Sequence, residues 1–321
     1  MSDYLKKRIL LVGAGYMAEE YCKVLIELQV NFEVVGKSDI NINKLRNIYN
    51  KNIFYSGGLE NYKIGNEIYT HAIIASAVEK LSDHAKILLN AGIKNILLEK
   101  PGDLNTSCLI ELKKLAEKLY AKIWVAYNRR FYSSVRELKK QVKLDGGIIS
   151  THFEFTEWVH TIDPNIYNNK VLNKWIIANS SHVIDTVFYL IGLPKSLNSI
   201  VLGQNQIEWH PSGSIFIGSG ISEQGIPFTY HSNWLSSGSW AVEILTSKRR
   251  FYLKPMEKLF VQNIETIQLE EFIIDNEKDK KYKPGLMDQT ISFIKCSETE
   301  LLGITKHIET MPYYMKIGGY C

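Results

Sequence analysis

The sequence has few cysteines, no long apolar run and no cluster of positive charge, and each absence excludes a class of protein. The four cysteines, Cys22, Cys108, Cys296 and Cys321, are far apart and form no C-x-x-C pair, so neither a zinc site nor a redox pair is predicted. No run of about 18 apolar residues predicts a membrane span. The 38 basic and 34 acidic residues are well mixed, unlike the basic stripe of a nucleic-acid binder. We therefore expect a soluble, cytoplasmic protein with free thiols and with no metal, membrane or nucleic-acid partner.

The remaining patterns predict two domains in the 321 residues. In residues 1–127, short apolar segments alternate with amphipathic segments of helical period, which predicts an α/β domain with a doubly wound parallel sheet. In residues 128–321 the pattern changes. Strand-like segments from about 196 to 261 are broken by turn-like segments, and a last helix is predicted within 285–296. This part is predicted to be an α+β domain on a largely antiparallel, open sheet.

A glycine motif lies at the first predicted strand-to-helix turn. Gly13, Gly15 and Ala18 have the G-x-G-x-x-A spacing. Gly13 permits a tight turn, Gly15 lets the backbone approach a pyrophosphate, and Ala18 allows the helix to pack closely on the strand. The amides at the helix N-terminus favour an anion. The motif therefore predicts a dinucleotide site.

The end of the second predicted strand should distinguish NADP from NAD. The chain reads "VVGKSD" there, with Lys37 and Ser38 before Asp39. Lys37 and Ser38 suit a 2′-phosphate, whereas Asp39 suits the ribose hydroxyls of NAD. NADP is favoured because Asp39 comes late, but NAD and a solvated loop remain alternatives.

The segment "NILLEKPG" ends a predicted buried strand with two charged residues, Glu99 and Lys100, before Pro101. Open α/β sheets bind ligands at the carboxyl ends of their strands. Hydride transfer to or from a carbinol carbon needs a proton partner and a positive group near the oxygen, and a lysine can supply both. The alternative is that Lys100 is a solvated strand end.

The sequence resembles the family of glucose-fructose oxidoreductase, inositol dehydrogenase and the rhizopine catabolism protein, Gfo/Idh/MocA. The resemblance covers most of the chain and is carried by "ILLVGAGYMA", "SDHAKILLNAGIKNILLEKP", "AYNRRF", "SSHVIDTVFYLIG" and "GLMDQTISFI". It implies a Rossmann domain, a catalytic Lys100 beside the nicotinamide, a role for Glu99 in the cofactor pocket, and a cis peptide bond between Lys100 and Pro101.

The family's second catalytic motif is similar to D-x-x-x-H-x-x-D. On "SSHVID" it implies that His182 donates or accepts the proton, with Asp185 on the same helix face, where it is structural, an orienter or a substrate contact. A core histidine is the alternative for His182. Ala178 stands where the family has its first aspartate, so one carboxylate is missing.

The resemblance and the residues together give these expected sites. The cofactor site is expected to comprise Gly13, Gly15, Tyr16, Met17, Lys37, Ser38, Ala75, Ser76, Glu99, Lys100 and Asn128. Substrate contacts are expected from Tyr127, Arg129, Lys174, Asn179 and Asp185, although Arg129 equally suits a structural ion pair.

The expected function is NAD(P)-dependent hydride transfer at a hydroxyl or keto carbon of a sugar or sugar derivative, including nucleotide-linked sugars. The resemblance also implies a homodimer or homotetramer formed through the strands of 196–261. Two alternatives remain. The missing carboxylate at Ala178 favours a dinucleotide-binding sensor without turnover, and the same fold also supports reduction of a tetrapyrrole or an imine.

Overall fold

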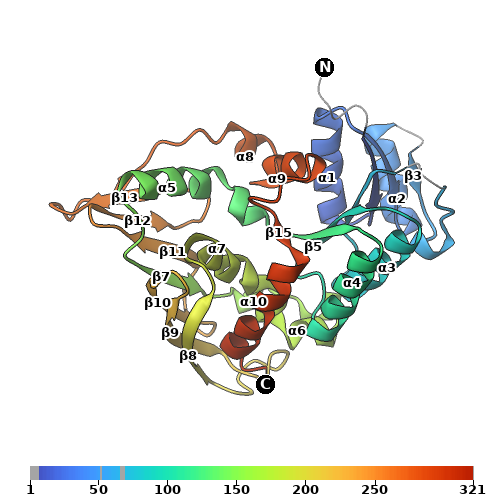
Figure 1. The fold of residues 1–321 in the computed structure, drawn as a ribbon. Coiled ribbons are helices and arrows are strands. Elements are labelled where there is room, and N and C mark those ends of the chain that lie inside the picture. The colour runs from blue at the N-terminus through green and yellow to red at the C-terminus, as the bar shows by residue number, and fades with distance from the viewer. Residues whose placement is uncertain (1–6, 51–52, 66–68, 321) are drawn as a thin grey trace. The chain divides into compact units, whose positions relative to one another are not determined.

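The computed structural model describes residues 7–50, 53–65 and 69–320, and the chain divides into two compact units (Figure 1). Unit one comprises Met1–Tyr127 and Lys281–Glu309, and unit two comprises Asn128–Lys280 and Thr310–Cys321. The predicted domains divided the chain once, after residue 127. The segment 281–309 instead returns to unit one, because its helix has an apolar face that packs there. Cys22, Cys108 and Cys296 are free thiols, and Cys321 lies outside the described residues.

Unit one is built on a parallel sheet whose strand order is β15-β6-β5-β4-β1-β2-β3. Among the strands of the described residues, β15 alone runs antiparallel, beside β6. The strands are β1 (Arg8–Val12), β2 (Asn31–Val35), β3 (Phe54–Tyr55), β4 (His71–Ile74), β5 (Asn95–Glu99), β6 (Lys122–Ala126) and β15 (Leu302–Gly303). Central strands such as β4 and β5 are apolar on both faces because helices cover both sides of the sheet. The predicted doubly wound sheet is confirmed.

Helices cover both faces of this sheet. The helices of unit one are α1 (Tyr16–Glu27), α2 (Asp39–Tyr49), α3 (Leu81–Asn90), α4 (Thr106–Lys118) and α9 (Leu286–Ile294), with short turns η2 (Leu59–Asn61) and η3 (Val78–Lys80). Helices α3 and α4 pack on each other and share a buried core with β1, β4 and β5. On α9, Phe293 contacts the rings of His71 and Trp124 at centroid distances of 5.1 and 5.9 Å. These contacts explain why the returning segment belongs to unit one.

Helix α10 (Ile304–Gly318) follows β15 and continues from unit one into unit two. The last helix predicted from the sequence lay within 285–296, and α10 was not predicted. Pro312 lies inside this helix and interrupts the sequence signal for a helix, because proline lacks the amide that an inner turn requires.

Unit two is built on a sheet whose strand order is β14-β13-β12-β11-β7-β10-β9-β8. The strands are β7 (Ser150–Phe155), β8 (Pro194–Leu202), β9 (Ile215–Ser222), β10 (Pro227–Asn233), β11 (Trp240–Leu245), β12 (Arg249–Leu253), β13 (Phe260–Asn263) and β14 (Glu270–Glu271). Neighbours are antiparallel except β7 and β10, which are parallel. The predicted, largely antiparallel sheet is confirmed.

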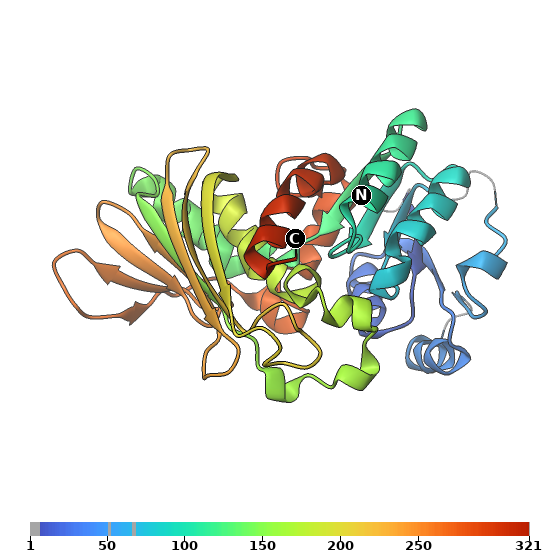
Figure 2. The ribbon, with the colours of Figure 1, turned by 90° about the horizontal axis from the view of Figure 1, so that it is seen from below.

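One face of this sheet is covered by helices (Figures 1 and 2). The helices and turns of unit two are η4 (Asn128–Phe131), α5 (Ser133–Leu144), η5 (Val159–Thr161), η6 (Pro164–Ile166), α6 (Asn169–Leu172), η7 (Ile176–Ser180), α7 (Ser181–Ile191) and α8 (Glu277–Lys281). Helix α7 packs on β7 and β11, above a core that includes Phe153, Phe155 and Tyr230. The two figures show no helix on the opposite face within the described chain. In residues 7–50, 53–65 and 69–320, no helix is long and apolar enough to cross a membrane.

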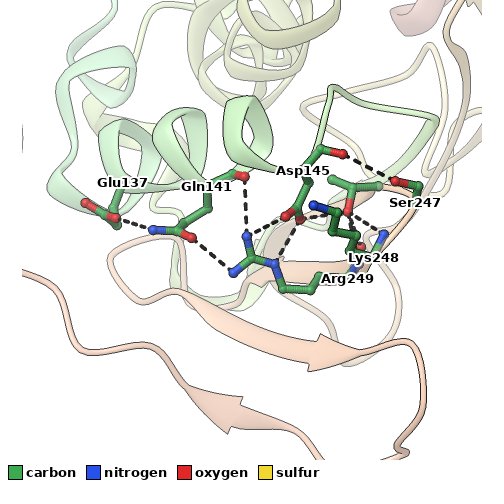
Figure 3. A network of polar contacts seen from close by, with 7 residues as sticks. Glu137, Gln141, Asp145, Ser247, Lys248 and Arg249 are labelled. Atoms are coloured by element: carbon green, nitrogen blue, oxygen red, sulfur yellow. Dashed lines mark hydrogen bonds and ion pairs between the residues drawn. The ribbon is translucent and has the colours of Figure 1, made fainter.

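A polar network fastens the end of α5 to the start of β12 (Figure 3). Asp145 accepts hydrogen bonds from Nε and Nη2 of Arg249 at 2.9 and 2.6 Å, and Gln141 Oε1 accepts from Nη1 at 3.0 Å. Glu137 accepts from Gln141 at 2.8 Å and extends the network along the helix. Because α5 and β12 are far apart in the sequence, this ion pair fixes the helix on the sheet.

Candidate functional site

The turn between β1 and α1 has two glycines with different physical roles. Gly13 has a φ of +127°, and a Cβ built on it would lie 2.3 Å from the carbonyl oxygen of Ala75. Only glycine fits this position, because a Cβ would clash with the backbone of Ala75, the residue that follows β4. A Cβ built on Gly15 would instead meet no atom within 4 Å. The protein itself therefore does not require a glycine at 15, and the space left open there suits a ligand.

Gly15 is also the N-cap of α1 and has an extended backbone. A glycine has no side chain to accept hydrogen bonds from the amides of the first turn. These amides carry the positive end of the helix dipole and point out of the helix end, as in pyrophosphate sites. The turn thus fits the phosphates of a dinucleotide.

A cavity of about 470 Å³ lies in front of this turn, at the carboxyl ends of β1, β2, β4 and β5. It is lined by Gly13, Ala14, Gly15, Tyr16, Met17, Lys37, Ser38, Asn41, Ala75, Ser76, Ala77, Val78, Glu99 and Lys100. The structure thus brings together the cofactor residues expected from the sequence except Asn128, which is buried in η4 of unit two. Ala14, Asn41, Ala77 and Val78 were missed. The sequence does not predict Asn41 as a cavity residue, because its position depends on where Ser38 caps α2.

The residues after β2 include both candidates for recognition of the ribose, which are Lys37 with Ser38, and Asp39. Lys37 and Ser38 line the cavity. Ser38 is also the N-cap of α2, where its Oγ accepts a hydrogen bond from the amide of Asn41 at 3.3 Å. Asp39 is exposed in the first turn of α2. The lysine ammonium and the serine hydroxyl are therefore the polar side chains that this loop gives to the cavity.

Glu99 is a buried carboxylate at the end of β5, with an exposed fraction of 8%. The hydroxyl of Tyr21 donates a hydrogen bond to Glu99 at 2.9 Å and also lies 3.3 Å from Gln289 Oε1 of α9. Burial raises the pKa of Glu99, while the bond from Tyr21 and the charge of Lys100 oppose that rise. The returning segment 281–309 thus supports a residue that lines the cavity.

Lys100 begins the tight turn after β5. The Lys100–Pro101 peptide bond is cis, as the resemblance implied. The amide of Gly102 donates to the carbonyl of Glu99 at 2.9 Å, and Nε2 of the buried His307 donates to the carbonyl of Pro101 at 2.7 Å. The turn that carries Lys100 is therefore held from α10 as well as from its own strand.

Tyr127 is placed in the core of unit one, with an exposed fraction of 1% and its ring 5.7 Å from the ring of His307. This position supports the Lys100 turn, whereas the sequence analysis expected Tyr127 among the substrate contacts. The sequence signal was the same for both, because an aromatic residue after a strand end can pack inward or face a ligand.

In unit two, the turn η7 has π-helical geometry and leads directly into α7. A π turn contains one more residue than an α-helical turn, so it changes the direction of the side chains around it, and such turns are frequent at functional sites. His182 follows in the first turn of α7. It has an exposed fraction of 7%, and its ring lies 6.2 Å from that of Trp240.

Asp185 and Arg130 form a buried ion pair. Arg130 donates to the two carboxylate oxygens from Nε at 2.7 Å and Nη2 at 2.6 Å, and Asp185 has an exposed fraction of 1%. The spacing of three residues put Asp185 on one face with His182, but the structure pairs it with η4. Asp185 is therefore engaged within the protein rather than directed to a substrate.

A second cavity, of about 330 Å³, lies within unit two beside η7. It is lined by Thr156, Glu157, Trp158, Thr161, Ile162, Asn179, Ser239 and Trp240. Of the expected substrate residues, Asn179 lines it, and the guanidinium of Arg129 packs over the ring of Trp240 at 4.4 Å. Lys174 is half-buried before η7, and its carbonyl accepts from the amide of Ala178 at 2.9 Å. Glu157, Ser239 and Trp240 were not predicted from the sequence as site residues.

Comparison with known proteins gives a family match and a set of similar folds. Residues 7–127 match the model of the Gfo/Idh/MocA oxidoreductase family with an NAD-binding Rossmann fold. No curated protein sequence shows significant similarity to the chain.

Three solved structures illustrate the similarity. A dehydrogenase, MviM, from Clostridium difficile is 19% identical, with a TM-score of 0.77 over 98% of this chain and 100% of that chain. The WlbA dehydrogenase from "Chromobactrium violaceum", solved with NADH and UDP-GlcNAcA, is 16% identical, with a TM-score of 0.72 over 100% and 95%. The UDP-N-acetylglucosamine 3-dehydrogenase GnnA from Acidithiobacillus ferrooxidans is 11% identical, with a TM-score of 0.73 over 97% and 96%.

At these identities the similarity to solved structures establishes the fold, and the family match applies to residues 7–127. The glycine turn, the cavity at the carboxyl ends of the strands and the Lys-Pro turn all lie within that matched segment. Residues 7–127 therefore form a segment of the type described by the Gfo/Idh/MocA oxidoreductase family, with an NAD-binding Rossmann fold.

Proposed function

We propose that the protein is an NAD(P)-dependent dehydrogenase or reductase that acts on a hydroxyl or keto carbon of a sugar or sugar derivative, including nucleotide-linked sugars. The observation that carries the proposal is the cavity of unit one, in which Lys100 lies with the glycine turn at the carboxyl ends of four strands. Dehydrogenases for UDP-sugars among the similar folds support the choice of substrate class.

In this proposal the bound nicotinamide supplies or accepts the hydride. Lys100 stabilises negative charge on the reacting oxygen, because it lines the cavity at the end of a buried strand, on a turn that is held by one backbone hydrogen bond and one from His307. His182 is proposed as the second proton donor or acceptor, because its ordinary pKa lies near neutrality. Glu99, buried beside the cavity, supports the wall against which the cofactor binds.

Lys37 and Ser38 support NADP as the preferred cofactor. Both line the cavity at the end of β2, and together they offer an ammonium and a hydroxyl to a 2′-phosphate. We propose that NADP binds more tightly than NAD by about tenfold, which corresponds to about 1.4 kcal/mol from one additional charge-assisted contact.

The open face of the sheet in unit two supports a homo-oligomer with a second copy of the chain. Ile200, Leu202, Ile217 and Ile221, on β8 and β9, are 37 to 57% exposed. Exposed apolar side chains on one face of a sheet are typical of contact surfaces between proteins. Sedimentation analysis should give a dimer or tetramer, and replacing Ile217 and Ile221 by Lys should give a monomer. A monomeric wild-type chain would contradict this part of the proposal.

The experiment that tests the function is a titration with NADPH and NADH followed by nicotinamide fluorescence, and then a screen of keto-sugars and UDP-keto-sugars for loss of that fluorescence. Binding followed by oxidation supports the proposal. Binding without turnover across the panel favours the sensor without catalysis, for which Ala178, in place of a carboxylate, is the supporting feature. Failure to bind either cofactor overturns both functions.

A further inference from the structure

The cavity of unit two contains a carboxylate, from a different part of the chain, that is hydrogen-bonded to the π turn η7 just before α7. Glu157 lies two residues after β7 and has an exposed fraction of 6%. Asn179 Nδ2 donates to its two oxygens at 3.2 and 3.1 Å, and Ser180 Oγ donates to one of them at 2.6 Å. These donors sit on the π turn directly after Ala178. Glu157 therefore places a carboxylate beside the π turn, in which Ala178 supplies none.

The charge of this carboxylate is stabilised by its surroundings. Besides the two hydrogen-bond donors, Glu157 interacts electrostatically with the guanidinium of Arg129. Arg129 is held by packing over the ring of Trp240 at 4.4 Å and over that of Tyr132 at 5.6 Å. Hydrogen-bond donors and a nearby cation both favour the charged form of a carboxylate. Glu157 is thus a strong hydrogen-bond acceptor in the cavity wall.

Ser239 provides an independent sign that the cavity takes a polar ligand. Its Oγ is buried from solvent and makes no hydrogen bond with any group of the described chain, although the residue lines the cavity. An isolated buried hydroxyl is unfavourable unless it finds a partner, so each such group calls for an explanation. A ligand hydroxyl in the cavity would supply that partner.

The remaining walls fit the apolar side of a sugar ring. Trp240 and Trp158 line the cavity with Glu157, Asn179 and Ser239. An indole face packs well on the C–H groups of a pyranose, while a carboxylate and an amide bind its hydroxyls. The cavity of about 330 Å³ is large enough for one such ring.

The charge of the lining separates a neutral sugar from an acidic one. Of the eight lining residues, all within the described chain, Glu157 is the one that carries charge, and it is negative. A ligand carboxylate placed here would meet like charge, which is unfavourable in a partly buried site. A neutral ring is therefore the better fit.

Resting on the proposed function, we propose that this cavity binds a neutral, hydroxyl-rich glycosyl ring, with Glu157 accepting hydrogen bonds from ring hydroxyls, Ser239 bonded to one of them and Trp240 packed on the ring. Glu157 and Ser239 determine specificity for the substrate in this account. Their role is binding, so it is separable from the chemistry at Lys100.

The test is a titration of the full-length protein, without cofactor, by tryptophan fluorescence. The probes are methyl glycosides of glucose, galactose, mannose and N-acetylglucosamine, and methyl glucuronide as the charged comparison. We expect saturable quenching by at least one neutral glycoside, and binding of the glucuronide at least tenfold weaker than that of its matched glucoside. Quenching by none of the neutral glycosides, or equal binding of the glucuronide, would overturn the proposal.

Two variants separate binding from folding. Glu157→Gln keeps an acceptor for Asn179 and Ser180 but loses the charge, and we expect about a tenfold to hundredfold weaker affinity for the neutral glycoside. Ser239→Ala should also weaken binding, while the thermal stability of the free protein stays the same or rises, because the isolated hydroxyl is gone. The matched control is Glu243→Gln on β11, which pairs with Arg250 outside the cavity and should leave binding unchanged.

The outcomes distinguish this proposal from the proposed function. If the enzyme turns over a sugar and Glu157→Gln leaves KM unchanged, the glycosyl site is wrong and the function stands. If glycosides bind in a manner that depends on Glu157 but no sugar is oxidised or reduced, the site stands and the proposed function is wrong.

Discussion

The buried ion pair of unit two gives a prediction that separates a structural role from substrate binding. The change Asp185→Asn removes the charge that pairs with Arg130 while it keeps the shape of the side chain. Both partners are nearly inaccessible, with side-chain exposed fractions of 10% for Arg130 and 1% for Asp185. The guanidinium would then be buried without a counter-charge, and breaking a buried pair on one side costs about 3–5 kcal/mol.

The expected result is a loss of stability of that size. For a unit of this length, about 1 kcal/mol shifts Tm by roughly 2–4 °C, so the variant should melt roughly 6–20 °C lower. Urea unfolding followed by circular dichroism measures the change in free energy, and steady-state kinetics measure KM. The double variant Arg130→Met with Asp185→Leu is the matched control, since replacing both charges by apolar groups is often close to neutral.

An unchanged melting temperature together with a raised KM would refute the structural role of Asp185. If Asp185→Asn melts within about 2 °C of the wild type while KM rises tenfold or more, Asp185 contacts the substrate and the pair is not structural.

Three further predictions concern the two units separately. Gly13→Ala should lower stability, because its Cβ would clash with a backbone oxygen 2.3 Å away at a φ of +127°. Gly15→Val should leave the melting temperature unchanged and abolish NADPH binding, as measured by fluorescence. A stable Gly13 variant together with a destabilised Gly15 variant would contradict this prediction. Lys37→Ala should lower NADPH affinity about tenfold and leave NADH affinity unchanged, and equal losses for both cofactors would argue against a 2′-phosphate contact. Stability should fall as the pH drops from about 6.5 towards 4, because burial lowers the pKa of His210 to about 4, so protonation favours the unfolded state by up to about 3 kcal/mol. His210→Gln should flatten this part of the urea-unfolding profile, and an unchanged slope would contradict the assignment.

Much of unit one could be predicted from the sequence because its signals are local. Gly13 and Gly15 lie in one short turn between an apolar strand and an amphipathic helix, and Lys100 follows directly after a buried strand. Parallel strands bring their carboxyl ends to one edge, so residues that each follow a strand meet in one cavity. The parallel sheet thus brings together residues that are far apart in the sequence.

The cavity of unit two could not be predicted in the same way. Glu157 meets Asn179 and Ser180 across more than twenty residues, and the contact depends on the π turn, for which no local pattern exists. Ser239 and Trp240 reach the same place because β11 pairs with β7. In an antiparallel sheet with irregular connections, such contacts cannot be predicted until the register of the strands is known.

The segment 281–309 shows a second limit of local patterns. The apolar face of α9 was visible in the sequence, and it predicted a helix. It did not predict which sheet the helix would cover, because an apolar face fits either one. The hydrogen bond from Tyr21 to Gln289 of α9 depends on that choice.

The most direct test of the account is the replacement of Lys100 by Met, measured as turnover and as NADPH affinity in the same preparation. Lys44→Met, on the exposed side of α2, is the control for loss of a lysine in the same unit. If the ammonium at the end of β5 stabilises the reacting oxygen, kcat falls by about a hundredfold or more while NADPH affinity stays within about tenfold. An unchanged kcat in the Lys100 variant would contradict the account.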